Sequence, residues 1–249
     1  MTRRLLLGAS GVVAFLILAE LAGRLGDFPR ASEVLVAAAG LAVDGPFLAN
    51  VGATLTACLT GLLIAIAVAV PAGLLLGTVP AIERSVRPLV EFLRPIPSLS
   101  LIPLAMFLWT DSQDAKTALI VYTCSWPLLI NTMYGLGDVD PLAKDSMRAF
   151  GFGPFAVLMR VSLPSTAPFI VTGVRIAVSV TLIVAVSVEL IAGGSGGLGT
   201  FLVEAGSANR RELVLAGTLW AGVIGVVANM LFTAAERRLF RWHHVRNAE

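Results

Sequence analysis

Residues 138–168 read DVDPLAKDSMRAFGFGPFAVLMRVSLPSTAP, a polar stretch inside a chain that is otherwise mostly apolar. Asp140 is placed to cap a helix, and Pro141 suits the first helical position. Gly151 is placed to end that helix, because glycine readily adopts the left-handed conformation found after a last turn. The stretch therefore begins with a short helix that starts at Pro141 and ends near Gly151.

A second short helix is expected directly after the first. Gly153 and Pro154 predict its start, while Pro164 and Pro168 predict its end. Residues 138–168 would then form a helix–turn–helix elbow that is too polar to cross a bilayer. On composition alone, such an elbow is more often only a solvated connector between two membrane spans.

The composition of the whole chain indicates an integral membrane protein. Its 249 residues are 57% hydrophobic and only 14% charged, with a mean hydropathy of +0.87. A soluble domain of this size needs far more polar surface. The net charge of +2 gives no reason to expect nucleic acid as a partner. Cys58 and Cys124 lie in apolar runs, so we expect free buried thiols without a disulfide or metal.

The apolar segments predict six transmembrane helices in a single domain that covers residues 1–249, at about residues 5–25, 51–79, 95–110, 117–137, 168–191 and 213–235. Glu20 and Arg24 lie one turn apart near the end of the first, which we interpret as uncleaved. Between the first two spans, Ser32 is placed to cap an interfacial helix that ends near residues 45–46. Pro71 is expected to kink the second span.

Small and hydroxylated residues in the second span predict close packing against other helices. Its threonines can bond back to helix carbonyls, and its glycines allow other helices to approach closely. These residues are Thr54, Thr56, Thr60, Gly61, Gly73 and Gly77.

The third span is interrupted by prolines at positions 95, 97 and 103. Broken helices free backbone groups, which must be buried in protein or face a wet path. Pro97 and Pro103 are therefore candidates for the wall of a translocation path. A kinked helix with only a packing role explains the same prolines equally well.

Glu189 is an acid near the outer end of the fifth span. It lies 14 residues after Arg175, about 21 Å along a helix. An ionisable residue inside a membrane is a candidate functional residue by default. One interpretation is that Glu189 caps the amides of the glycine-rich loop that follows; the other is a pathway or substrate contact. That loop, residues 194–199, fits G-x-G-x-x-G, but no strand is expected before it, so it does not predict a dinucleotide site.

The distribution of basic residues predicts the orientation of the six spans. With the N-terminus inside, 13 of the 18 Lys and Arg residues fall on the inner side: Arg3, Arg4, Arg84, Arg87, Arg94, Lys144, Arg148, Arg160, Arg175, Arg237, Arg238, Arg241 and Arg246. The other five are Arg24, Arg30, Lys116, Arg210 and Arg211. This bias places both termini and the elbow in the cytoplasm.

The elbow also carries a spaced motif. From Asp145 the chain reads D-S-M-x-x-x-G, then nine residues, then V-x-L-P at Val161 to Pro164. This resembles E-A-A-x-x-x-G-x9-I-x-L-P, the cytoplasmic signature of ABC importer permeases. Asp145 keeps the acid of the pattern, whereas Ser146 and Met147 replace its two alanines.

Other fragments resemble the permease branch that imports nitrate, taurine, aliphatic sulfonates and bicarbonate, which also includes permeases for vitamin precursors and aromatic acids. They are LRPIPSLSLIPLA (93–105), INTMYGL (130–136), GVRIAVS (173–179), VELIAGGSGGLG (188–199) and ERRLFRW (236–242). The resemblance runs from about residue 19 to 242.

The resemblance implies an all-α type I ABC importer permease fold in a bacterial inner membrane, with the core region at about residues 45–240. It implies three kinds of partner besides membrane lipid: separate ABC ATPase subunits, an external solute-binding protein, and a second permease copy, identical or a paralogue. The elbow would be the coupling helix that docks on the ATPase. Its implied coupling residues are Asp145, Ser146, Met147, Arg148, Phe150, Gly151, Phe152, Phe155, Val161, Leu163 and Pro164.

The chain itself offers no route to ATP hydrolysis or other catalysis. It contains no G-x-x-x-x-G-K-[ST] motif and no Ser-His-Asp or His-Glu-x-x-His arrangement. We therefore expect a non-catalytic subunit without cofactor or metal, whose ATP is bound by a partner. The alternative is an ion-coupled secondary transporter or a channel that works without an ATPase. The sequence does not name the solute.

Overall fold

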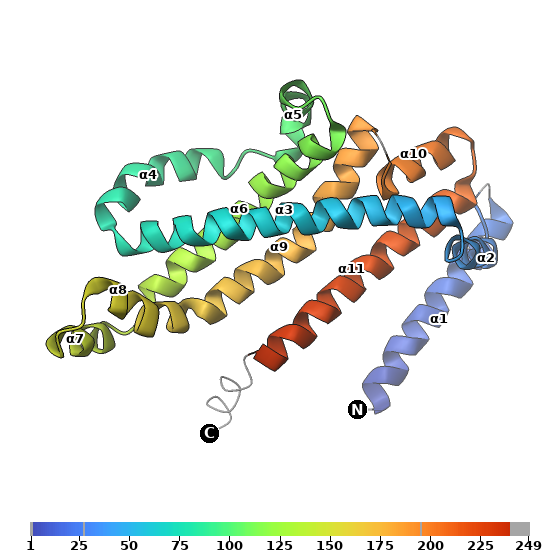
Figure 1. The fold of residues 1–249 in the computed structure, drawn as a ribbon. Helices are drawn as coiled ribbons and strands as arrows, with labels where there is room; N and C mark the ends of the chain where they lie inside the picture. The colour runs from blue at the N-terminus through green and yellow to red at the C-terminus, as the bar shows by residue number, and fades with distance from the viewer. Residues whose placement is uncertain (1, 27, 195, 240–249) are drawn as a thin grey trace.

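A computed structural model describes residues 2–26, 28–194 and 196–239, and every regular element in these ranges is a helix (Figure 1). In chain order the elements are α1 (Thr2–Leu25), α2 (Ala31–Leu41), α3 (Gly45–Thr78), α4 (Pro80–Leu93), a 3-10 turn (Ser98–Leu101), α5 (Ile102–Leu108), α6 (Ser112–Gly137), α7 (Pro141–Ala149), α8 (Pro154–Val157), a π-helical turn (Leu158–Ser162), α9 (Leu163–Ala192), α10 (Leu198–Ser207) and α11 (Arg211–Leu239). This confirms the expected all-α class.

Within the described residues, four helical segments are long and apolar enough to cross a membrane. They are α3, α6, the continuous run Pro154–Ala192, and Arg211–Arg238. The second, fourth, fifth and sixth expected spans are therefore single helices. The third, expected at about residues 95–110, is not a spanning helix: it holds only the 3-10 turn and α5, and Ser98–Leu108 meets the preceding α4 at a bend of 84°. α1 has 24 residues, and its role as the first span stays a prediction.

The core is a bundle of α3, α6 and α9, which pack along much of their lengths (Figure 1). Its fully buried positions are mostly small or aliphatic, among them Ala65, Ala69, Ile120, Leu128, Ala177 and Ala185. Glycines of α3 face α6 so closely that an added Cβ would lie 2.6 to 2.8 Å from Ile120, Thr132 or Leu136. The predicted close approach at Gly61, Gly73 and Gly77 is confirmed. Of the three threonines singled out in α3, Thr56 and Thr60 bond back to helix carbonyls as expected. The Thr54 hydroxyl lies 3.3 Å from the Asn50 carbonyl but closer, at 2.9 Å, to the Glu189 carboxylate.

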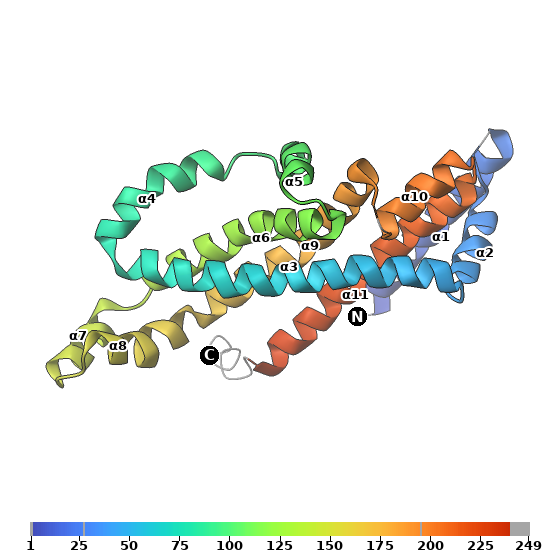
Figure 2. The ribbon, with the colours of Figure 1, turned by 45° about the horizontal axis from the view of Figure 1, so that its top comes forward.

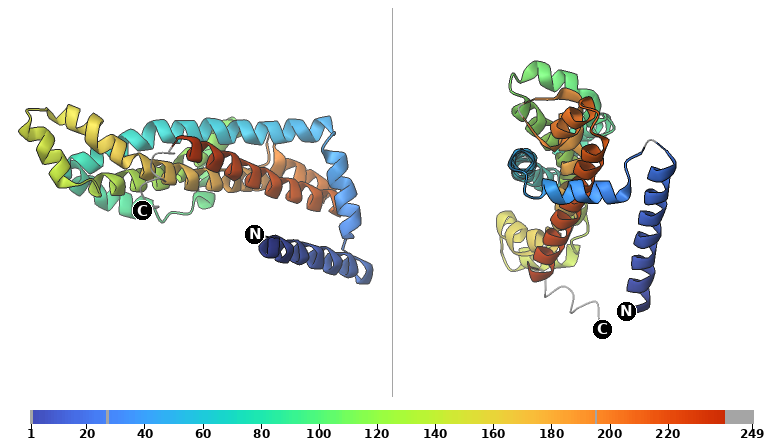
Figure 3. Two further views of the ribbon diagram at one scale, coloured as in Figure 1. Left: turned by 90° about the horizontal axis from the view of Figure 1, so that it is seen from below. Right: turned by 90° about the vertical axis from the view of Figure 1, so that its right-hand side faces the viewer.

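A smaller cluster ties α2, α10 and α11 to the start of α3. Phe47 packs edge-on against Phe201, with ring centroids 4.9 Å apart. The Trp220 indole donates to the Ala38 carbonyl at 2.9 Å. α1 contacts this cluster through α2 and stands apart from the bundle (Figure 3, right).

Two local predictions about α2 and α3 are wrong. Ser32 does not cap α2, because its backbone N–H and hydroxyl both donate to Glu20, which also pairs with Arg24 as expected. Residues 45–46 do not end that helix either. They begin α3, because the Asp44 carboxylate accepts the N–H of Phe47 at 2.8 Å and proline fits the first turn.

The long helices separate the molecule into two ends. α7 and α8 lie at one end of the bundle, whereas α2 and α10 lie at the other (Figures 1 and 2). The N-terminal end of α1 and the C-terminal end of α11 point away from α2 and α10. Arg241 and Arg246, counted in the charge bias, lie outside the described residues.

Candidate functional site

The first limb of the elbow is the helix α7. The Asp140 carboxylate accepts the N–H of Leu142 at 2.8 Å, and Pro141 occupies the first turn. At the other end Gly151 has φ +81°, and the Phe152 N–H bonds to the Met147 carbonyl at 3.1 Å. This left-handed glycine closes the helix as predicted.

The second limb does not end where the sequence predicted. α8 begins at Pro154 as expected, but Pro164 and Pro168 do not stop the helix; the chain passes through the π-helical turn Leu158–Ser162 into α9. Pro164 lies in the first turn of α9, where a missing N–H is tolerated, and the wider π turn absorbs the change in bonding. The elbow is therefore one end of a continuous helical run, Pro154–Ala192.

The elbow carries an exposed aromatic surface, formed by Phe150 and Phe155 with exposed fractions of 82% and 75%. Phe152 is partly covered, since the Arg160 guanidinium lies 5.2 Å from its ring centroid. We call Phe150, Phe152 and Phe155 the aromatic face. Exposed aromatic side chains at the end of a bundle are typical anchors of a protein interface.

The remaining predicted coupling residues surround this face without forming a buried site. Asp145 and Arg148 pair with each other at 3.0 Å, and both are mostly exposed. Ser146 bonds back to the Leu142 carbonyl. Met147, Val161 and Leu163 are partly buried, and Pro164 is exposed. The Lys144 ammonium of α7 donates to the Leu136 carbonyl of α6 at 3.2 Å, which links the two helices.

At the other end of the bundle, Glu189 lies in a buried polar network. Its carboxylate accepts from the Lys116 ammonium at 2.6 Å, from the Thr54 hydroxyl at 2.9 Å and from the Gly199 N–H at 2.9 Å. Both charged side chains are 2% exposed. Glu189 therefore already has partners from α3, α6 and α10.

The same network caps the first turn of α10. The Gly197 N–H donates to the Asn50 side chain at 2.7 Å, and the Leu198 N–H donates to the Thr54 hydroxyl at 2.8 Å. Together with Gly199, three successive backbone donors are satisfied by side chains of α3 and α9. A Cβ at Gly197 would clash with the Glu189 carboxyl. This geometry is what the loop-capping interpretation of Glu189 requires; its pathway role stays a prediction.

Sequence reasoning did not assign Lys116, Thr54 or Asn50 to this network. The available signal was weak: Lys116 is a single cation at the start of an apolar span, 73 residues before Glu189. Only the packing of α6 against α9 brings the two charges together.

The proline-rich third span turns sharply where Pro97 and Pro103 lie. Pro97 precedes the 3-10 turn, and Pro103 lies in the first turn of α5. Both prolines are exposed. The Tyr122 hydroxyl of α6 holds the break by donating to the Leu93 carbonyl at 2.7 Å. The path and packing interpretations of these two prolines both stay open.

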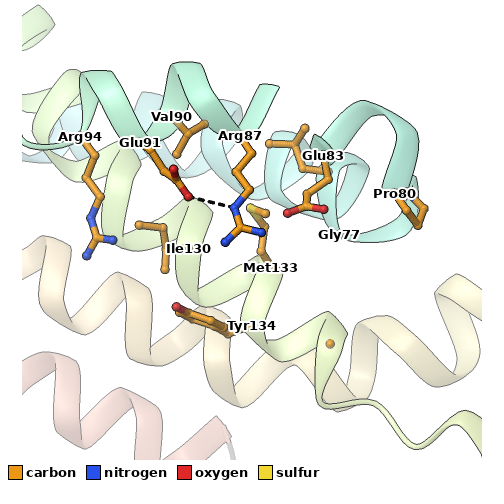
Figure 4. Close-up of a pocket in the computed structure, with 12 residues that line it drawn as sticks. Gly77, Pro80, Glu83, Arg87, Val90, Glu91, Arg94, Ile130, Met133 and Tyr134 are labelled. Carbon is orange, nitrogen blue, oxygen red and sulfur yellow. Dashed lines mark hydrogen bonds and ion pairs between the residues drawn. The ribbon is translucent and has the colours of Figure 1, made fainter. Parts of the chain in front are cut away.

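A pocket of about 410 Å³ separates α4 from α3 and α6 (Figure 4). α4 turns a charged side toward it, and α6 contributes apolar side chains and one phenol. The lining residues are Leu76, Gly77, Pro80, Glu83, Arg87, Val90, Glu91, Arg94, Ile130, Met133, Tyr134 and Gly137. Arg87 and Arg94 of this lining were counted only in the charge bias, and the sequence predicted no site here.

No group of three or more His, Cys, Asp or Glu residues placed to hold a metal ion occurs in the described part of the chain. Cys58 and Cys124 are free thiols; Cys124 is buried as expected, whereas Cys58 is only partly buried.

Comparison with known proteins identifies the family. The sequence model described as "Binding-protein-dependent transport system inner membrane component" matches residues 61–241. A probable ABC transporter permease protein of Brucella melitensis is 30% identical over 214 residues, which are 86% of this chain and 87% of that protein. The nitrate import permease protein NrtB of Leptolyngbya laminosa is 27% identical over 192 residues, 77% of this chain and 68% of that protein.

The fold has a solved counterpart. A crystal structure of a bacterial alginate ABC transporter, in complex with an alginate pentasaccharide-bound periplasmic protein, contains a chain that superposes with a TM-score of 0.67 at 14% identity, over 96% of each chain. The family match confirms the resemblance that the elbow motif and the sequence fragments indicated. The chain belongs to the family of binding-protein-dependent transport system inner membrane components, the permease subunits of ABC importers.

Proposed function

We propose that this permease forms the membrane path of an importer whose ATPase is a separate protein that docks on the aromatic face of the elbow. The observation that carries the proposal is the continuity of the helical run Pro154–Ala192. A partner that moves α8 also moves α9, because the helical run is not broken between them, although it contains a π-helical turn and Pro168. Closure of the ATPase on ATP would thus be transmitted from the elbow toward the opposite end of the bundle.

The proposed orientation places the elbow and both termini in the cytoplasm of a bacterial cell. It is supported by the excess of basic residues in the segments on the elbow side. An ATPase could then reach α7 and α8, and an external binding protein could deliver solute near α10. The periplasmic protein bound to the structurally similar alginate transporter supports this arrangement.

The path itself requires a second permease copy, identical or a paralogue. In the single chain α4 stands away from α6 over the pocket, and its outer side exposes Leu89 and Phe92. We propose that two copies enclose the path between the broken third span, α6 and α9. Pro97, Pro103 and Glu189 are the pathway candidates on these elements.

The proposed solute is small, of the anion class of nitrate and the sulfonates or of the vitamin-precursor class. The similarity to a nitrate import permease supports this range. The chain lacks a P-loop motif, so ATP would be bound and hydrolysed only by the partner. No cofactor of its own is proposed.

Co-purification from a mild detergent tests the proposal. The full-length permease, expressed with a candidate ABC ATPase from the same organism, is expected to retain that ATPase through affinity and size-exclusion steps. Replacing Phe150 and Phe155 by alanine is expected to release it. A permease that purifies without any ATPase and still accumulates solute would instead support the ion-coupled carrier.

A further inference from the structure

We propose that Arg94 forms a binding site for a small oxyanion in the pocket between α4 and α6. The inference deepens the proposed function, on which it rests for the physiological solute, because it assigns the transported class as anions. It is carried by the depth of Arg94, by its lack of an ion-pair partner, and by the groups that surround it.

The depth of Arg94 follows from one hydrogen bond. The Tyr122 hydroxyl of α6 donates to the carbonyl of Leu93, the residue that precedes Arg94. Tyr122 lies 10 residues from Ser112 and 15 from Gly137, the two ends of α6. At 1.5 Å per residue these separations are about 15 and 22 Å, so the backbone of Arg94 lies within the span and not in the cytoplasmic segment to which the charge count assigned it. An arginine at that depth is costly unless it faces a wet cavity or a counter-charge.

Two of the other three charges in the pocket pair with each other. Arg87 donates to Glu91 at 2.9 Å, and Figure 4 shows Arg87 between Glu91 and Glu83. The Arg94 side chain makes no hydrogen bond or ion pair with any described residue, and it is exposed to the pocket. The lining residues from α3 and α6 carry no charge. Arg94 is therefore the one basic side chain of this lining without an ion pair, and the unpaired acid Glu83 lies on the far side of Arg87 from it.

The surrounding groups suit a small oxyanion. A guanidinium presents parallel N–H donors in a planar fork, which matches the oxygens of a nitrate, carboxylate or sulfonate. The phenol of Tyr134, a residue that is 69% exposed, can add a neutral donor from α6. Ile130 and Met133 supply an apolar wall that strengthens electrostatic attraction by excluding water. A cation would meet the guanidinium as a like charge.

A labelling experiment on the full-length permease tests the site without needing an ATPase. Cys58 and Cys124 are replaced by alanine, and Ile130→Cys places one thiol in the pocket wall beside Arg94. The thiol is reacted with an anionic reagent, sulfonatoethyl methanethiosulfonate, and with its cationic trimethylammonium counterpart. Nitrate is added as the competing probe.

With Arg94 present, the anionic reagent is expected to react faster, and nitrate is expected to slow it. Charge-assisted hydrogen bonds of this kind correspond to about a tenfold preference or more. Arg94→Gln should abolish both effects, and Arg94→Lys should keep part of them. Arg84→Gln is the matched control, because Arg84 lies on the same helix outside the pocket and bonds to the Pro80 carbonyl.

Three results would overturn the proposal. One is a faster reaction with the anionic reagent that nitrate does not slow, since this would show a positive local potential without a binding site. Another is labelling that is equally fast in Arg94→Gln. The third is labelling by the anionic reagent that is slowed by phosphatidylglycerol in liposomes but not by nitrate, which would show that the guanidinium binds a lipid phosphate.

Uptake measurements separate this inference from the proposed function. In proteoliposomes with the ATPase and binding protein, Arg94→Gln is expected to keep ATPase binding and basal ATP hydrolysis but to lose nitrate or methanesulfonate uptake by about tenfold or more. ATP-driven uptake of a neutral or cationic solute alone would overturn the anion assignment and leave the permease function standing. A wild-type chain that binds no ATPase would overturn the proposed function, whatever the labelling shows.

Discussion

Lys116 and Glu189 show how single residues position the end of the bundle that carries α10. A lysine and a glutamate, each 2% exposed, meet at 2.6 Å inside a helical membrane protein. Desolvation of the two ions is offset by the pair itself and by the donors Thr54 and Gly199. The network therefore links α3, α6, α9 and α10 through buried hydrogen bonds and one ion pair.

Lys116→Met is expected to destabilise the protein by about 3–5 kcal/mol, because it leaves the Glu189 carboxylate buried without its counter-charge. The double variant Lys116→Met/Glu189→Gln should recover part of this loss, since no unpaired charge remains. Thermal unfolding in detergent measures both changes. Lys116→Met as stable as the parent would contradict this account of the pair. So would a double variant that loses more stability than Lys116→Met and Glu189→Gln lose in total.

Gly151 is the residue on which the shape of the elbow depends. Its φ of +81° excludes proline, and its N–H donates to the Arg148 carbonyl at 2.9 Å. Gly151→Pro is expected to leave membrane insertion intact while uncoupling ATP hydrolysis from transport. Gly151→Ala has open space but carries a strain of roughly 1–2 kcal/mol, and should weaken coupling less.

Gly153→Ala is the matched control for this prediction. Gly153 lies in the same turn, has open space around it and has φ −70°, which any residue adopts. Solute accumulated per ATP hydrolysed in proteoliposomes is the measurement. Normal solute-stimulated ATPase activity in Gly151→Pro would contradict the role given to the bend.

Residue-level patterns predicted some of these features and missed others for a physical reason. Asp140, Pro141 and Gly151 act through neighbours within a few positions, so the sequence alone specified the α7 helix. Glu189 stood out as a lone acid in an apolar run. Its partner Lys116 is 73 residues away, and nothing in either local sequence states how α6 and α9 pack.

Among the elements, the α8–α9 run determines how the elbow can act. Prolines were expected to stop the second limb, but the π-helical turn lets the helix continue past Pro164. Proline breaks a regular α-helix because it lacks an N–H and its ring clashes with the carbonyl of residue i−4. A π-helical turn changes the hydrogen-bond spacing before Pro164, so the helix can continue past it. Because the helix is continuous, Phe155 of the aromatic face lies on the same helical run as α9.

Phe150→Ala and Phe155→Ala are each expected to weaken ATPase binding by about 2 kcal/mol, roughly thirtyfold, because exposed aromatic anchors dominate interface energies. Phe107→Ala is the matched control: Phe107 is 86% exposed but lies on α5, away from the elbow. Binding of purified ATPase to immobilised permease gives the affinities. Equal losses at Phe107 and Phe150 would remove the aromatic face from the account.

The contact between α3 and α6 depends on glycine at the crossing. A Cβ at Gly73 would lie 2.8 Å from the Thr132 Cβ and 3.0 Å from the Leu129 carbonyl oxygen. Gly73→Ala is expected to destabilise the bundle by about 1–3 kcal/mol through overpacking. Gly52→Ala, on the same helix with open space, should be neutral or slightly stabilising. Thermal unfolding in detergent compares the two, and equal stability would contradict the close packing.

The whole molecule places its two polar features at opposite ends of one apolar bundle. The elbow lies at one end, the Lys116–Glu189 network lies at the other, and α9 belongs to both. Composition was enough to predict a helical membrane protein, because no soluble fold tolerates so little polar surface. The arrangement of the broken third span was not predictable, since prolines state where a helix bends but not in which direction.

The account as a whole holds that this permease moves solute only when a separate ATPase drives its elbow. Solute accumulation against a gradient, in proteoliposomes that contain the purified permease with its binding protein, tests this most directly. The account predicts accumulation when the ATPase and ATP are present, and none when either is omitted. Uphill accumulation by the permease without an ATPase would contradict it.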